Sequence, residues 1–249
     1  MPRKAPGKGS SRPRDGGGQR GSGRRGSAGI VRRGIGRPAA GPRAVGREAL
    51  INRTCELLMQ LPPNRITRAE VARRMGVDPS LIRYYFRDRS MLLLAAVEKL
   101  TDQFARIREA EQRRADPGPE GALCARVSAL LKFEITYPFF HRLLLDELMH
   151  LNAPAASRFL QQLSANAIAG YGSILESGHK QGLFRRTDSA LLFLAVIGMC
   201  EFFVNGMPIV RLALGKAFDE RDLSARYRDF ICDLLLHGLK GRAASPAAT

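Results

Sequence analysis

The sequence predicts an all-α protein with an N-terminal three-helix helix-turn-helix domain and a larger C-terminal helical domain. Apolar residues recur at helical spacing through most of the 249-residue chain, and no segment shows the strict alternation of a strand. Residues 67–86 have the pattern of two short helices joined by a glycine turn. Basic residues concentrate in the same N-terminal part of the chain. These observations predict a helical protein that binds nucleic acid through its N-terminal part.

The net charge of +17 is unevenly distributed along the chain. Residues 1–45 contain twelve Lys or Arg against one acid, residues 46–91 nine against five, and residues 92–249 nineteen against seventeen. Basic charge gathered on one part of a protein is the expected footprint of a nucleic-acid-binding surface. A basic membrane-surface protein would instead have a long helix with Lys and Arg opposite an apolar face, and the basic N-terminus has no such face.

Residues 1–43 consist mainly of Gly, Arg, Ser and Pro, with almost nothing to bury. We therefore expect a disordered, Arg/Gly-rich basic arm. Two interpretations are open for this arm. Either it holds nucleic acid by charge, as the Arg/Gly segment 20–26 suggests, or it is a solvated tail with no dedicated role.

A first helix is expected over residues 45–61, ended by Pro62 and Pro63. Its apolar stripe consists of Leu50, Ile51, Thr54, Leu57, Leu58 and Leu61. Together with the two helices of the 67–86 motif, it would form a three-helix DNA-binding unit.

The motif begins at Thr67, whose spacing to Glu70 is that of a capping box. Gly76 can adopt the left-handed conformation that ends a helix, and Asp78 and Pro79 are suited to start the next one. The residues expected to face inward are Val71, Ala72, Met75, Ile82, Tyr85 and Phe86. Those expected to face outward from the second helix are Ser80, Arg83 and Tyr84. Two ordinary packed helices would show the same pattern, but the surrounding basic charge favours a DNA-reading unit.

The remaining helices are expected over residues 89–114, 121–137, 138–150, 155–181, 188–205 and 222–239. The helix at 188–205 is apolar nearly all round, which predicts burial on more than one side. The last helix has a wide apolar stripe. This stripe either closes the core of a single domain or forms a homodimer interface, since two-fold symmetric proteins read two half-sites.

The sequence offers no pattern for catalysis or metal binding, so we expect neither an enzyme nor a cofactor. The four histidines lack metal-ligand spacing, and no phosphate loop, dinucleotide fingerprint or nucleophile elbow occurs. The four cysteines are far apart within apolar helical patterns, which predicts packing in a reducing compartment. No secretory signal is present, and the longest apolar run, residues 190–200, is too short to span a bilayer. We therefore expect a cytoplasmic protein without a membrane partner.

Residues 47–94 resemble the TetR family of transcriptional regulators. The likeness rests on Thr67-Arg-Ala-Glu-Val-Ala-Arg-Arg-Met-Gly-Val and on Ser80-Leu-Ile-Arg-Tyr-Tyr-Phe-Arg-Asp-Arg-Ser-Met-Leu-Leu93. A weaker likeness covers residues 177–188. The chain departs from the family in its long basic arm and at Met91, which replaces the usual acid of the capping box in the fourth helix.

The resemblance implies a homodimeric repressor that leaves a palindromic double-stranded operator when a small molecule binds between its C-terminal helices. It places a DNA-binding domain at residues 44–104, a ligand-binding and dimerisation domain at 105–240, and a disordered tail at 241–249. The DNA-binding residues that it implies are Thr67, Arg68, Pro79, Ser80, Arg83, Tyr84, Tyr85 and Arg89. Thr67, Arg68 and Arg89 would contact phosphate, Tyr85 the backbone, and the other four the major groove.

Eight large residues lie in the helices that would enclose the ligand: Phe104, Phe133, Tyr137, Phe140, Tyr171, Phe193, Met199 and Phe202. Each alone is more typical of a core, but together they predict an apolar or aromatic effector, with His141 and Glu201 as candidate polar contacts. The homodimer is expected through residues 188–205 and 222–239. The alternative function is an RNA- or nucleoid-associated protein that acts mainly through its basic arm.

Overall fold

The computed structural model describes residues 45–151, 153–214 and 220–240, which all belong to one unit of the chain, Ala44–Thr249. Throughout these residues the regular secondary structure is helical, apart from one isolated antiparallel bridge between Phe184 and Lys240. The predicted all-α class is therefore confirmed. The predicted arm at 1–43 and tail at 241–249 lie outside the described residues.

Three short helices form an N-terminal head: α1 (Arg47–Leu58), α2 (Arg68–Met75) and α3 (Pro79–Tyr85). The first helix is shorter than predicted, because the chain leaves it for a turn and a 3₁₀ helix, η1 (Pro63–Arg65). Gly76 ends α2 with a φ of +65°, which a residue with a side chain rarely adopts. The Asp78 carboxylate then accepts a hydrogen bond from the Ser80 amide at 2.7 Å and starts α3.

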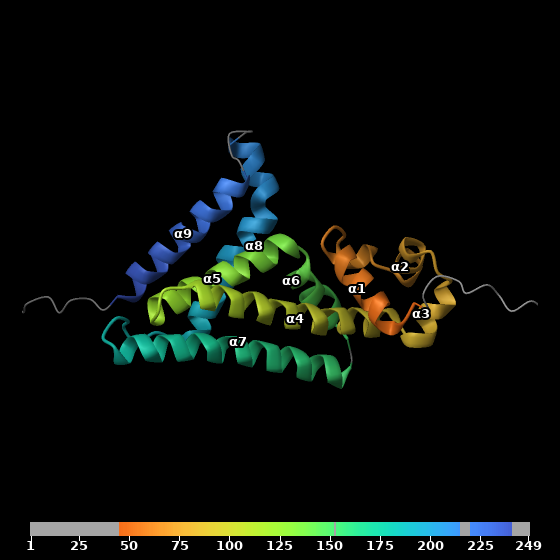
Figure 1. Cartoon of the computed structure of the whole chain (residues 1–249), viewed down its shortest axis with the longest axis horizontal. Helices are drawn as coiled ribbons and strands as arrows, with labels where there is room; N and C mark the ends of the chain where they lie inside the picture. The colour runs from red at the N-terminus through yellow and green to blue at the C-terminus, as the bar shows by residue number, and fades with distance from the viewer. Residues whose placement is uncertain (1–44, 152, 215–219, 241–249) are drawn as a thin grey trace, which may run out of the picture. The chain divides into compact units, whose positions relative to one another are not determined.

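The long helix α4 (Arg89–Arg114) leads from the head into the C-terminal part (Figure 1). Its start is capped by Asp88, whose carboxylate accepts a hydrogen bond from the Met91 amide at 2.9 Å. Met91 therefore does not prevent the cap, because the backbone amide at this position supplies the donor. The N-terminal half of α4 is buried against α1, and the rest of it packs along α5.

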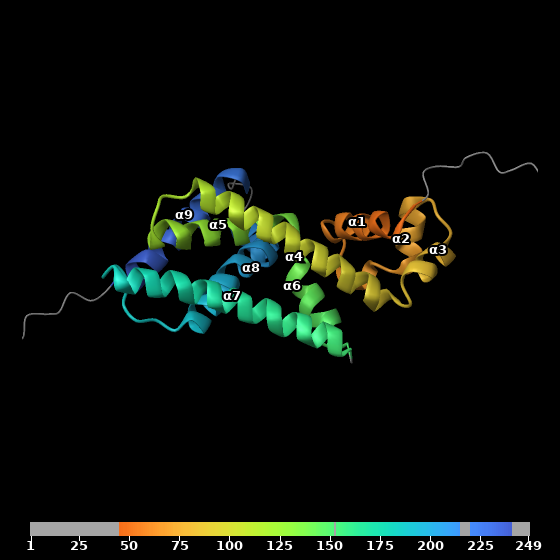
Figure 2. The same ribbon diagram turned by 60° about the horizontal axis from the view of Figure 1, so that its bottom comes forward.

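Four further long helices make up most of the C-terminal part: α5 (Pro119–Thr136), α7 (Pro154–Lys180), α8 (Ser189–Leu214) and α9 (Glu220–Leu239). Helix α5 packs against α4, α7, α8 and α9, and so lies at the centre of this part (Figures 1 and 2). Its central position explains why most of its residues from Leu123 to Glu134 are buried.

The segment between α5 and α7 is not the single helix predicted at 138–150. A short α6 (Phe140–Arg142) continues as a π-helical segment, η2 (Leu143–Leu148). A π turn is a wider, rarer coil than an α turn and often occurs at functional sites. Here η2 packs against both α4, which continues from the head, and α7, which belongs to the C-terminal part.

Two apolar cores stabilise the described residues. The first joins the head to the N-terminal half of α4, the end of α5 and the α6–η2 segment. The second joins α5, α7, α8 and α9. Phe104 of α4 packs against both cores, which makes it a connection between them.

Helix α8 is longer and more exposed than predicted. It continues past Asn205 to Leu214 with Pro208 inside it, so the predicted end of this helix was wrong. One side is buried through Leu192, Val196 and Cys200. Large apolar side chains on other sides are exposed: Leu191, Leu194, Phe202, Ile209 and Leu212. Within Ser189–Ala213 an 18-residue window reaches a mean hydropathy of 1.9, so by length and composition alone this helix could cross a membrane.

Candidate functional site

Helix α3, the third helix of the head, presents the side chains that were predicted to face outward. Pro79, Ser80, Arg83 and Tyr84 are all exposed, and Tyr84 is 80% exposed. An aromatic ring so open to solvent contributes little to the fold. The structure thus brings these four predicted groove residues together on one helix.

The inward residues of the head hold that helix in place. Val71, Ala72, Ile82 and Phe86 are buried as predicted. Tyr85 is half-buried and packs edge-on against the ring of Tyr84, with centroids 5.0 Å apart.

The start of α2 is capped, but by half of the predicted capping box. The Thr67 hydroxyl accepts a hydrogen bond from the Glu70 amide at 3.1 Å. The Glu70 carboxylate does not return to the Thr67 amide; it accepts hydrogen bonds from Arg73 and Arg74 instead. These two guanidinium groups lower the pKa of Glu70 to about 2. The reciprocal bond was wrongly predicted because local arginines compete for the same carboxylate.

The three residues predicted to contact phosphate occupy different environments. Thr67 is exposed at the start of α2, and the Arg68 guanidinium donates to the carbonyl oxygen of Arg87 at 3.2 Å. Arg89, by contrast, is bound within the protein. Its Nε donates to the Ile66 carbonyl oxygen at 2.7 Å. This guanidinium already has several acceptors within the protein. The contact between Arg89 and phosphate remains a prediction.

Arg89 also forms a bidentate ion pair with Glu147 of η2. Arg89 Nη1 lies 2.5 Å from Glu147 Oε2, and Nη2 lies 2.8 Å from Oε1. A further bond runs from Nη2 to the carbonyl oxygen of Pro63. Because paired parallel bonds fix both groups in orientation, Arg89 connects η2 to the turn that precedes α2.

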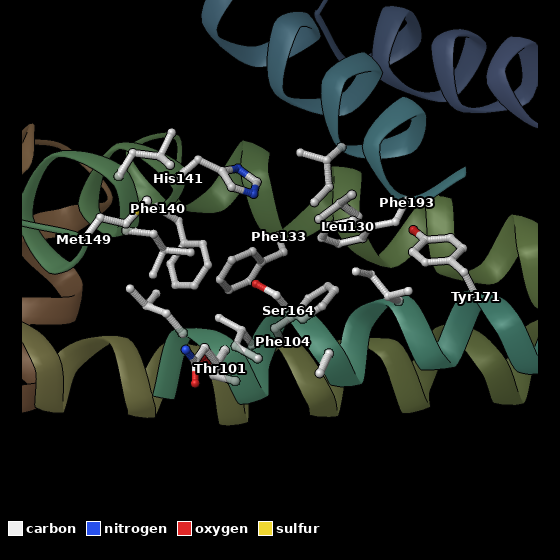
Figure 3. Close-up of a pocket in the computed structure, with 18 of the residues that line it drawn as sticks. Thr101, Phe104, Leu130, Phe133, Phe140, His141, Met149, Ser164, Tyr171 and Phe193 are labelled. Atoms are coloured by element: carbon white, nitrogen blue, oxygen red, sulfur yellow. The ribbon is translucent and has the colours of Figure 1, made fainter. Parts of the chain in front are cut away.

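A cavity of about 770 Å³ lies among α4, α5, α6–η2, α7 and α8 (Figure 3). Its lining includes Thr101, Phe104, Leu130, Phe133, Phe140, His141, Leu144, Leu145, Met149, Ser164, Tyr171, Phe193 and Ile197. Phe133 is one of these lining residues and packs against Phe104 and Phe140 at centroid distances of 5.1 and 4.9 Å. A volume of this size is typical of sites for small organic ligands.

Five of the eight predicted ligand residues line this cavity: Phe104, Phe133, Phe140, Tyr171 and Phe193. The other three do not. Tyr137 is buried in the first core and its hydroxyl donates to Gln103 at 3.0 Å. Met199 packs against the second core, and Phe202 is 65% exposed. Phe193 and Ile197 are one turn apart on α8, so the next position on that face is Glu201 rather than Phe202.

The sequence analysis missed the contribution of η2 and of an acid on α5. Leu144, Leu145 and Met149 line the cavity, but no spacing argument distinguishes them from core residues. Glu134 is 3% exposed, and its Oε1 lies 3.3 Å from Nδ1 of His141. The sequence feature that could have identified Glu134 is the position of an acidic residue within the apolar run of α5.

Burial and the charge of Glu201 both shift the pKa values of Glu134 and His141. Burial raises the pKa of Glu134 to about 8, and Glu201 adds to the rise. Burial also lowers the pKa of His141, an effect that Glu201 opposes. At neutral pH both side chains are therefore mainly uncharged. Within the described residues, no group of three or more His, Cys, Asp or Glu side chains could hold a metal ion.

Comparison with known proteins extends the likeness from the head to the C-terminal part. A family profile described as the tetracyclin repressor-like C-terminal domain matches residues 119–235. The transcriptional repressor NicS of Pseudomonas putida is 28% identical over 163 residues, which cover 64% of this chain and 76% of that protein.

Solved structures share the fold at lower identity. A regulatory protein of the tetR family from Rhodococcus RHA1 has a TM-score of 0.61 and 18% identity, covering 78% of this chain and 96% of that one. AibR, solved with isovaleryl coenzyme A and operator DNA, has a TM-score of 0.59 and 13% identity, covering 76% and 96%. Together with the helix-turn-helix head, these similarities establish that the chain belongs to the TetR family of DNA-binding transcriptional regulators.

Proposed function

We propose that the protein is a homodimeric repressor that binds a palindromic operator and leaves it when a small apolar or aromatic molecule fills the cavity. One observation carries this proposal: α4 starts directly after the DNA-reading helix and contributes Thr101 and Phe104 to the cavity. A ligand that displaces Phe104 therefore acts on the helix that carries the head.

The part of α4 that joins the head to the cavity is short. Phe104 follows Arg89 by fifteen residues, which is about 22 Å of α-helix. The recognition helices of a dimer must match successive major grooves roughly 34–36 Å apart, so a small rotation of α4 changes the fit of both heads. Coupling between two sites in regulators of this kind is typically about 1–3 kcal/mol. The ligand must prefer the DNA-free arrangement by that amount.

On the DNA side, we assign base reading to Arg83 and Tyr84, with Pro79 and Ser80 beside them in the major groove. Thr67, Arg68, Tyr85 and Arg89 are assigned to the DNA backbone. Support comes from the exposure of the first four residues and from the position of the others at the start of α2, the end of α3 and the start of α4.

The homodimer is proposed to form through α8 and α9, within the predicted ranges 188–205 and 222–239. Exposed large apolar side chains lie on both helices, among them Phe202 on α8 and Phe230 and Leu234 on α9. Exposed apolar surface of this extent marks an interface in most soluble proteins. A second copy would cover it and would also supply the second head that a palindrome requires.

We assign the protein to the cytoplasm, without enzymatic activity or a cofactor. The similar proteins support this assignment, since NicS is named as a transcriptional repressor. AibR was solved with both isovaleryl coenzyme A and operator DNA, which supports a repressor that responds to a small molecule.

The test begins with selection of bound fragments from random and genomic DNA by the full-length protein. One palindromic sequence is the expected result, whereas salt-sensitive binding without sequence preference would favour the RNA- or nucleoid-associated alternative. A metabolite panel is then screened for release of the labelled operator. Ile168→Trp, which fills the cavity without touching the head, should abolish the response to an active compound. If the response persists in this variant, the effector binds elsewhere.

A further inference from the structure

The cavity offers a ligand one basic side chain among its described lining residues, that of His141. Its lining is mostly apolar, with Thr101, His141, Ser157, Gln161, Ser164 and Tyr171 as the polar members and no Lys or Arg among the described lining residues. In Figure 3 the His141 ring lies at the edge of the cavity, beside Phe140 and Phe133. His141 therefore presents a basic, titratable ring to the ligand.

A buried carboxyl group without a hydrogen-bond partner lies directly behind this histidine. Glu134 follows the lining residue Leu130 by one helical turn, and neither of its carboxylate oxygens has a hydrogen-bond partner. Buried polar groups are nearly always paired, so this acid is the exception that calls for an explanation. Glu201 follows the lining residue Ile197 by one turn of α8 and acts electrostatically on Glu134, and both acids lie outside the set of lining residues.

Among the described residues, the groups that act on Glu134 include no Lys or Arg. The groups that interact electrostatically with Glu134 are Glu201 and Cys200 on α8, Tyr171 on α7, and His141 beyond the end of α5. Burial raises the pKa of both Tyr171 and Cys200 to about 12, so both are neutral at pH 7. Arg126 stacks on the Tyr171 ring at 4.4 Å from its centroid but does not line the cavity.

We propose that the cavity binds a lipophilic amine, whose ammonium group lies against His141, the lining residue that contacts Glu134 and that Glu201 influences electrostatically. This inference deepens the proposed function, on which it rests, by giving the chemical class of the effector. An anionic ligand would lie near two acids, and the described lining residues include no Lys or Arg. A neutral ligand would leave Glu134 unpaired. An ammonium group would supply a positive charge near these acids and would favour the ionised form of Glu134, which can accept a hydrogen bond from His141.

Binding of the ammonium group requires Glu134 to lose one proton. In the empty cavity Glu134 holds a proton because it is buried. When the ammonium binds, Glu134 gives this proton to solvent, and its carboxylate accepts a hydrogen bond from Nδ1–H of His141. Nε2 of His141 is then an acceptor for the ammonium. The faces of Phe133 and Phe140 add cation–π attraction. Binding therefore exchanges one proton for one ligand cation.

Calorimetry with three matched probes tests this proposal: 4-phenylbutylamine, 4-phenylbutanol and 4-phenylbutyrate. The amine should bind at least about tenfold more tightly than the alcohol, because a charge-assisted hydrogen bond is much stronger than a neutral one. Titrations at pH 7 in buffers with different ionisation enthalpies should show release of about one proton for the amine and none for the alcohol. The affinity of the amine should increase between pH 6 and pH 8, the range in which Glu134 becomes easier to ionise.

Two variants locate the effect. Glu134→Gln keeps the shape of the protonated acid and should remove both the proton release and the advantage of the amine over the alcohol. Glu176→Gln, at an exposed position of α7, should change neither. Tightest binding of the butyrate, or an unchanged amine affinity in Glu134→Gln, would overturn the proposal, as would failure of the amine to bind. The proposed function is judged separately: if the alcohol binds and releases the operator, that function stands even when the amine inference fails.

Discussion

At the scale of single residues, the side chains that matter for function are those that the fold leaves without a structural task. Tyr84 is open to solvent although it is aromatic, and Glu134 is buried although it is an acid. Both placements are unfavourable for the isolated fold. They are understandable when the partner is DNA in one case and a ligand in the other.

Arg83→Ala should weaken operator binding by about 1–3 kcal/mol, because Arg83 is exposed on α3 where it can reach a base edge. The loss on random DNA should be much smaller. Arg113→Ala, exposed in the last turn of α4, is a matched control and should have little effect on either DNA. Fluorescence anisotropy at fixed salt measures all of these affinities. Equal losses on operator and random DNA would show that Arg83 contacts only phosphate.

The protonation of Glu134 should be visible in stability as well as in ligand binding. Its pKa is raised in the folded state to about 8, so the folded state prefers the protonated acid. The wild type should therefore lose stability relative to Glu134→Gln as the pH rises from about 4.5 to 8, by at most about 1.4 kcal/mol per pH unit. Urea unfolding at constant protein concentration measures the difference. Parallel stability curves would mean that Glu134 is ionised in the folded protein.

At the scale of elements, the π-helical segment η2 links the cavity to the head. Leu144 and Leu145 line the cavity, while Glu147 on the same segment binds Arg89 at the start of α4. Residues two or three apart on one short coil thus contact the two proposed functional regions. Because Arg89 also donates to Ile66 next to α2, the ion pair adds a polar connection between η2 and the head to the apolar packing of the first core.

Glu147→Gln should reduce the coupling between ligand and operator, because a neutral amide cannot replace the bidentate carboxylate. The ratio of operator dissociation constants with and without ligand should shrink by a factor that corresponds to about 0.5–2 kcal/mol. Arg89→Met should give the same reduction, and the double variant should show no further loss. Glu176→Gln is again the control. A coupling ratio equal to that of the wild type would show that α4 alone transmits the signal.

At the scale of the whole molecule, the largest unexplained feature of the described residues is the apolar surface of α8 and α9. Leu212 is 88% exposed, and Phe230 on α9 is 61% exposed. The free energy of leaving such side chains in water is unfavourable by roughly 25 cal/mol for each Å² of apolar surface. A second copy of the chain would remove this cost.

Leu234→Glu should convert the dimer to monomers, because this half-exposed side chain would place a charge in the interface. Leu235→Glu should instead destabilise the monomer itself, since Leu235 packs against the second core. Analytical ultracentrifugation and thermal unfolding separate the two results. A dimer that survives in Leu234→Glu would place the interface elsewhere. Flotation of the wild type with lipid vesicles would indicate that α8 has a membrane partner instead.

Deletion of residues 2–43 should leave the helical fold and the dimer intact, since the segment contains almost nothing that forms a core. Binding to all DNA should weaken, and the dependence of affinity on salt should flatten because fewer counterions are released. Measurements of operator affinity over a range of salt concentrations decide this. An unchanged slope would show that the arm does not reach DNA.

The sequence alone determined the fold class, the helix-turn-helix and most helix positions. These features follow from local rules: Gly76 ends a helix, Asp78 starts the next one, and apolar spacing of 3.6 residues marks each buried face. Helical periodicity also predicts that Arg83 and Tyr84 face outward. A short helix that packs against the head through one face exposes its opposite face.

Only the tertiary structure decided which residues form the cavity and how it is linked to the head. Phe133 lies in α5, and Tyr137 follows it by one turn at the end of this helix. Only Phe133 lines the cavity, because the packing of the neighbouring helices determines which of the two side chains meets empty space. The Arg89–Glu147 pair joins residues 58 positions apart, and the Glu134 site depends on three separate helical segments. Periodicity identifies the buried face of a helix, but the packing of several helices determines whether that face meets another side chain or an empty space.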